Sequence, residues 1–69
     1  MEGTLLRLLD GRYAINGEIP LENGDAIEIF MGESWFLTRI EQYKNEYFAV
    51  GLEGLYLFGL RARIPEGHI

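Results

Sequence analysis

The stretch LENGDAIEIFMGESWFLTRIE, residues 21–41, decides the fold, because it joins two turn signals to two runs of alternating apolar and polar residues. In AIEIFM, residues Ile27, Ile29 and Met31 occupy every second position. In WFLTRIEQ, which follows Gly32-Glu33-Ser34, the same period of two continues. A period of two places one set of side chains on each face of a β-strand, so this stretch predicts two antiparallel strands joined by a short turn.

Turn signals of the same kind recur along the chain, at Asp10-Gly11, Asn16-Gly17, Asn23-Gly24, Lys44-Asn45 and Glu53-Gly54. Asn and Gly tolerate the positive φ angles of tight hairpins. Nine glycines are spread over the chain, which interrupts every helical apolar period. The remaining strands are therefore expected in TLLRLL and RYAIN, which form a first hairpin, in YFAVG and in LRARI.

Five or six short antiparallel strands in 69 residues predict an all-β fold, a small SH3-like or OB-like barrel formed by one domain, residues 1–69. Pro20 is expected at a strand edge or in a turn, and Pro65 after the last strand. Residues 65–69, PEGHI, are expected to be a flexible tail.

Composition narrows the classes of function. The chain has no cysteine, which excludes disulfides and thiolate metal sites, and its start lacks the features of a signal peptide. We therefore expect a cytoplasmic protein, and the absence of a long apolar run predicts no membrane partner. Eleven acidic against six basic residues give an acidic protein of formal charge −5, which disfavours nucleic acid as a partner.

Residues suited to catalysis are few, so the sequence predicts no enzyme, no catalytic residues, no cofactor and no metal site. His68 is the only histidine and lies in the expected tail, and Ser34 is the only serine and lies in a turn signal. Neither has a neighbour in sequence that would form a nucleophile and base pair. The segment 51–55, GLEGL, lacks the Lys-Ser/Thr of a phosphate-binding loop and is interpreted as a plain turn.

The aromatic residues suggest a binding surface. If the alternating apolar side chains fill the barrel, Phe30, Trp35 and Leu37 point outward beside Arg39. The expected interior residues are Ile27, Ile29, Phe36, Ile40, Leu60 and Ile64. An exposed aromatic anchor beside an arginine has the composition of a protein-binding hot spot, so these four outward residues are the predicted binding site.

Three alternatives remain open. Trp35 can instead be core, packed under LEGLYLF, residues 52–58, acting as a lid. The apolar segment GLEGLYLFGL can form a homodimer interface, so that the protein acts as a structural assembly. Less favoured is single-stranded nucleic-acid binding, with bases stacked on the aromatic residues and phosphates neutralised by Arg39, Arg61 and Arg63.

The sequence also resembles two families. The order Gly24-Asp25-x-Ile27-Glu28-Ile29, a short turn and Trp35 resembles the centre of an SH3 domain, over residues 21–41. A longer resemblance runs through GTL, GRYAI, LENGD, Trp35-x-x-Thr38-Arg39-Ile40-Glu41, YFAVG and the closing GLRARI. It is to small bacterial proteins of the domain-of-unknown-function family DUF5348, which implies a bacterial source and no mechanism.

Overall fold

The computed structural model describes residues 1–65, which form seven antiparallel strands and no helix. Within this part of the chain there is accordingly no helix that could cross a membrane. The strands are β1 (Glu2–Arg7), β2 (Tyr13–Ile15), β3 (Ile19–Pro20), β4 (Ala26–Met31), β5 (Ser34–Tyr43), β6 (Glu46–Ala49) and β7 (Arg61–Arg63). The predicted all-β antiparallel fold is confirmed, with one more strand than expected.

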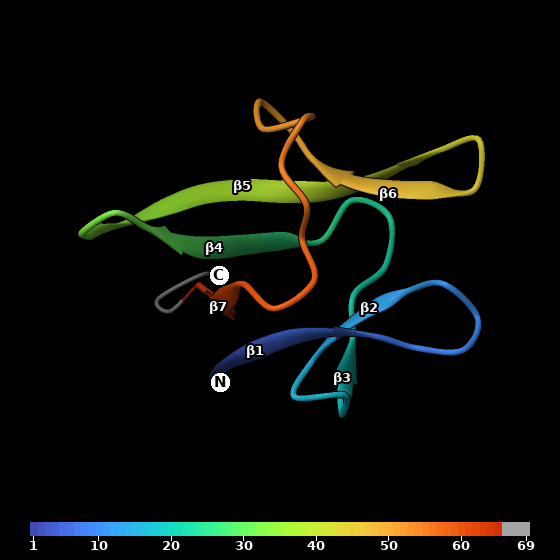
Figure 1. Ribbon diagram of the computed structural model, residues 1–69, viewed down its shortest axis with the longest axis horizontal. Coiled ribbons are helices and arrows are strands. Elements are labelled where there is room, and N and C mark those ends of the chain that lie inside the picture. Colours follow the sequence, from blue (N-terminus) through green and yellow to red (C-terminus); the bar gives the residue numbers. More distant parts are fainter. Residues whose placement is uncertain (66–69) are drawn as a thin grey trace.

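The strands form one curled sheet in the order β3-β2-β1-β7-β4-β5-β6, a half-barrel (Figure 1). Two hairpin units, β1-β2-β3 and β4-β5-β6, are joined through β7, which pairs with β1 on one side and β4 on the other. The strands at the two ends of the order, β3 and β6, do not pair with each other. The additional strand is β3, where Pro20 lies at a sheet edge, as a residue without an N–H requires.

Tight turns join the paired strands at the places that the sequence indicates. Asn16 and Gly17 have φ angles of 56° and 72° and connect β2 to β3. Lys44 and Asn45, at 52° and 65°, connect β5 to β6 without a glycine. Two successive positive φ angles are typical of the type I′ turn, whose twist matches that of the strands it joins.

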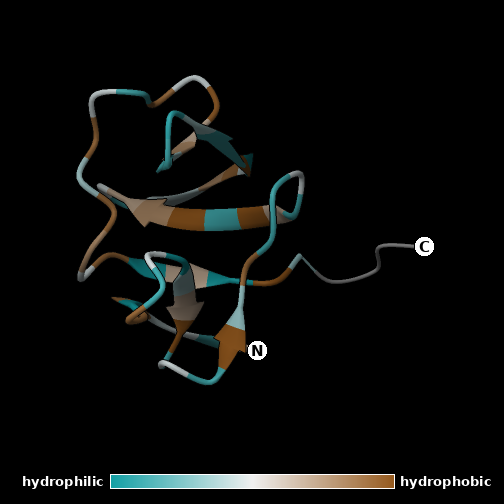
Figure 2. Cartoon of the chain, turned by 90° about the vertical axis from the view of Figure 1, so that its right-hand side faces the viewer, coloured by the Kyte–Doolittle hydropathy of each residue, from teal (hydrophilic) through white to brown (hydrophobic). Residues whose placement is uncertain are grey.

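The core consists of isoleucine, leucine and alanine side chains together with one tyrosine. Ile27, Ile29 and Ile40 are fully buried as predicted, whereas Leu60 and Ile64 are only partly buried. Other buried residues are Leu5, Tyr13, Ala14, Ile15, Leu21, Ala49, Leu57 and Ala62. Figure 2 shows apolar residues interspersed with polar ones along the strands, as expected when each strand has one buried face.

The prediction that Phe36 fills the interior is wrong, because its side chain is 46% exposed. Phe36 lies opposite Ile29 and so shares the inward face of the β4–β5 pair. However, β6 pairs only with residues 40–43 of β5, so no strand continues the sheet beyond Phe36. Alternation within β5 therefore predicts the face on which Phe36 lies but not its burial.

Residues 52–58 are neither strand nor helix. Leu57 enters the core, and Leu52 packs against it. Tyr56 and Phe58 point outward, 70% and 49% exposed, with ring centroids 6.3 Å apart. The expected tail is residues 65–69. Pro65 lies two residues after the end of β7, and residues 66–69 lie outside the described residues.

Candidate functional site

The predicted binding residues lie together on the outward face of β4 and β5. Phe30 and Trp35 are directly opposite each other across the hairpin, with ring centroids 5.1 Å apart. The pairs Glu28–Leu37 and Ala26–Arg39 continue the same face. Alternation from the buried isoleucines therefore predicted the direction of these side chains correctly.

Two arginines of β7 cover the aromatic rings. The guanidinium carbon of Arg63 is 4.0 Å from the centroid of Trp35, and that of Arg61 is 5.7 Å from the same ring and 5.6 Å from Phe30. Arg63 also donates to Glu28 at 2.7 Å, and Arg61 pairs with Glu2 of β1. A guanidinium stacked on an aromatic ring and held by a carboxylate forms an ordered arrangement.

Exposure differs among the four predicted residues. Trp35 and Phe30 are half-buried, whereas Leu37 is 67% exposed and Arg39 is exposed. Arg39 donates to Glu41 at 2.8 Å. Trp35 is thus outside the buried core, and its aromatic and cationic contacts come from β4 and β7 and not from residues 52–58.

The structure also contains a pocket that the sequence did not predict. It has a volume of about 650 Å³ and lies between the β1–β2 unit, the β5–β6 hairpin and the loop after β6. Its lining residues are Arg7, Tyr13, Glu41, Gln42, Tyr43, Lys44, Glu46, Tyr47, Phe48, Glu53, Leu55, Tyr56 and Leu57. The four tyrosines of the chain all line this pocket, although they are far apart in sequence.

Two cations lie beside tyrosine rings in this tyrosine pocket. The guanidinium carbon of Arg7 is 5.9 Å from the ring centroid of Tyr13, and the Lys44 ammonium is 5.4 Å from that of Tyr43. Burial raises the pKa of the Tyr13 hydroxyl, with Arg7 opposing the shift and Tyr56 and Glu46 adding to it. Tyr13 is therefore a neutral hydroxyl at physiological pH and can donate a hydrogen bond.

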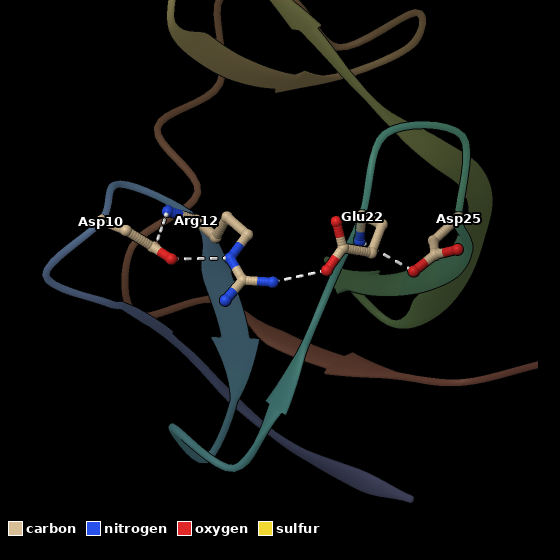
Figure 3. A network of polar contacts seen from close by, with 4 residues as sticks. All are labelled: Asp10, Arg12, Glu22 and Asp25. Carbon is tan, nitrogen blue, oxygen red and sulfur yellow. Dashed lines mark hydrogen bonds and ion pairs between the residues drawn. The ribbon is translucent and has the colours of Figure 1, made fainter.

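Outside the pocket, a polar network of four residues connects the turn between β1 and β2 to the loop between β3 and β4 (Figure 3). Arg12 donates from Nε to Asp10 at 2.9 Å and from Nη1 to Glu22 at 2.5 Å. The Glu22 backbone N–H donates to Asp25 at 2.8 Å. Because its members already satisfy one another, we interpret this network as structural, joining the β1–β2 turn to the β3–β4 loop.

The other residues considered for chemistry do not converge. Ser34 begins β5 and is exposed, and His68 lies outside the described residues. The GLEGL segment is a turn in which Glu53 accepts the Gly51 N–H at 2.9 Å, a bond that lowers the pKa of Glu53. In residues 1–65, no three acidic, histidine or cysteine side chains are grouped so that they could hold a metal ion.

Comparison with known proteins places the chain in a family without assigning an activity. Neither the curated proteins nor the solved structures contain a significant match. The family described as "Domain of unknown function (DUF5348)" matches residues 4–64, which include nearly all of the sheet. The chain therefore belongs to the DUF5348 family.

Proposed function

We propose that this protein is a non-enzymatic protein-binding module of the cytoplasm that recognises its partner through the outward face of β4 and β5, with Phe30, Trp35, Leu37 and Arg39 as contact residues. The observation that carries the proposal is the position of Leu37, a largely exposed leucine beside a Trp and Arg cluster. Trp and Arg dominate binding hot spots, and apolar neighbours exclude water around them.

The contacts that already hold the Trp35 side chain in place also support this face as the binding surface. Trp35 is already held between Phe30 and the arginines of β7, so it would lose little side-chain freedom on binding. Arg63 is in turn fixed by Glu28. A partner that covers Leu37 would gain apolar burial without having to order the aromatic anchor.

The test compares the substitutions Leu37→Lys and Leu9→Lys. Both add a charge at an exposed leucine, but Leu9 lies in the β1–β2 turn, away from the outward face of β4 and β5. Tagged wild type and both variants, shown to be folded by circular dichroism, would be used to capture proteins from a bacterial lysate. We expect one protein to be captured by wild type and by Leu9→Lys and lost with Leu37→Lys, and Trp35→Ala should lose it too. Equal capture by all four forms would exclude this face.

A homodimer is the second candidate, and the outward direction of Tyr56 and Phe58 favours it. These two rings are the exposed part of the apolar segment 51–60, whose Leu57 is used by the core. Light scattering over a range of concentrations would show a mass that rises to twice the monomer, and Phe58→Ser would prevent the rise. A constant monomer mass at high concentration would exclude this candidate.

Single-stranded nucleic acid is less well supported. It requires arginines on a face clear of acid, yet Arg39, Arg61 and Arg63 are each paired with a glutamate. A phosphate backbone would have to displace those carboxylates. Binding that weakens steeply with salt would be the required result.

A further inference from the structure

Two cations of the tyrosine pocket form no ion pair within residues 1–65. In residues 1–65, four of the six Lys and Arg side chains form ion pairs, namely Arg12, Arg39, Arg61 and Arg63. The remaining two, Arg7 and Lys44, both line the pocket. Acidic residues outnumber basic ones by eleven to six, so a shortage of carboxylates does not explain why these two are unpaired.

The carboxylates of the pocket are mostly engaged elsewhere. Glu41 accepts from Arg39, and Glu53 accepts the backbone N–H of Gly51. Glu53 and Glu46 both keep their negative charge, but neither forms an ion pair with Arg7 or Lys44 within residues 1–65. Each of those cations lies beside a tyrosine ring, which attracts the side chain without neutralising its charge.

The walls of the pocket suit an aromatic or apolar group. Tyr13, Tyr43, Tyr47 and Tyr56 line it together with Phe48, Leu55 and Leu57. Tyrosines combine a flat apolar surface with a hydroxyl that can donate to an anion. The volume of about 650 Å³ lies within the range of small-molecule sites.

We propose that the tyrosine pocket binds a carboxylate attached to an aromatic or apolar group, with Arg7 and Lys44 pairing with the carboxylate and the tyrosine rings enclosing the apolar part. Charge-assisted hydrogen bonds from a guanidinium give such a carboxylate its orientation. The carboxylate can come from a free aromatic acid or from the C-terminus of a peptide that ends in an apolar residue. None of the four contact residues of the proposed protein-binding face lines this pocket.

The probes are chosen in matched pairs that differ only in charge. The first pair is 3-phenylpropionate and 3-phenylpropionamide, and the second is acetyl-Gly-Phe with a free C-terminus and its amide. Each would be titrated into the ¹⁵N-labelled full chain while backbone amide resonances are followed. Binding in the pocket should shift the resonances of residues 43–48 and 55–57 in a saturable way.

The variants Arg7→Gln and Lys44→Gln test the cations, and Arg12→Gln, which removes the same charge outside the pocket and outside the proposed protein-binding face, is the control. Since a hydrogen bond to a charged group is lost, we expect either pocket variant to weaken binding of the carboxylate about tenfold and the control to leave it unchanged. Binding of both carboxylates would identify a peptide C-terminus as a source, and binding of phenylpropionate alone would identify a free acid. Absence of saturable shifts, equal shifts from the amides, or no effect of Arg7→Gln and Lys44→Gln would overturn the proposal.

Discussion

At the scale of single residues, the turn between β5 and β6 holds a lysine in a backbone conformation that glycine adopts more easily. Lys44 has a φ angle of 52° and the following Asn45 one of 65°. Asn adopts this left-handed conformation readily, but for a side chain such as lysine it costs about 1–2 kcal/mol, and glycine avoids that cost.

We therefore expect Lys44→Gly to stabilise the fold by roughly 0.5–1 kcal/mol, because part of the strain relieved is offset by the greater freedom of glycine in the unfolded chain. The urea midpoint of unfolding, followed by tryptophan fluorescence, would measure the change. Lys44→Ala is the control that removes the same side chain without relieving the backbone. Equal midpoints for the two variants would show that the φ angle of Lys44 is not strained.

The carboxylate of Asp10 offers a pH test at the same scale. Its pKa is held below the ordinary value of 3.8, chiefly by the backbone N–H of Arg12 and also by the guanidinium of that residue. A depressed pKa contributes stability that is present above pH 3.8 and is lost as the pH falls through the lower folded value.

Asp10→Asn should therefore have a lower urea midpoint than wild type at pH 7, and the difference should disappear in strongly acidic solution. Parallel denaturation curves from neutral pH to below 3.8 would test this. Glu33→Gln, at an exposed turn position without an ion pair in residues 1–65, makes the same change of charge as a control. A difference for Asp10→Asn that persists in acid would assign the effect to something other than this charge.

At the scale of elements, the sequence predicts strands well where two local signals agree. In β4 and β5 the alternation and the intervening turn both indicate a hairpin, and the outward direction of Trp35 followed from it. β3 was not predicted, because two residues ending in Pro20 carry no period. The error at Phe36 has a different origin, since its side chain lies on the inward face but beyond the part of β5 that pairs with β6.

The tyrosine pocket shows the limit of this reasoning for sites. Its lining residues run from Arg7 to Leu57 and meet only after the sheet has curled. No local spacing links Tyr13 to Tyr47 or Tyr56. The four tyrosines lie in β2, at the end of β5, in β6 and in the loop after β6, and no pattern in the sequence joins these positions.

The short strand β7 gives a prediction about packing between elements. Ala62 is fully buried in register with Gly3 on one side and Ile29 on the other. Ala62→Leu would add three carbons to a fully buried side chain of the core, which should destabilise the fold by about 1–3 kcal/mol.

Denaturation in urea would measure the loss, and Ala26→Leu, the same enlargement at a half-buried position on β4, should change stability much less. If Ala62→Leu were as stable as wild type, the contacts of β7 would not be tightly packed.

At the scale of the whole molecule, the sheet consists of two hairpin units that are joined through the three-residue strand β7. β1-β2-β3 and β4-β5-β6 are each contiguous in sequence, and within residues 1–65 the strand pairing between them passes only through β7. Local hairpins form quickly, whereas pairing of β1 with β7 must close a loop that spans most of the chain. Residues 61–63 are also translated after every other strand. We therefore expect the two half-sheets to form first and to remain separate until β7 pairs with both β1 and β4.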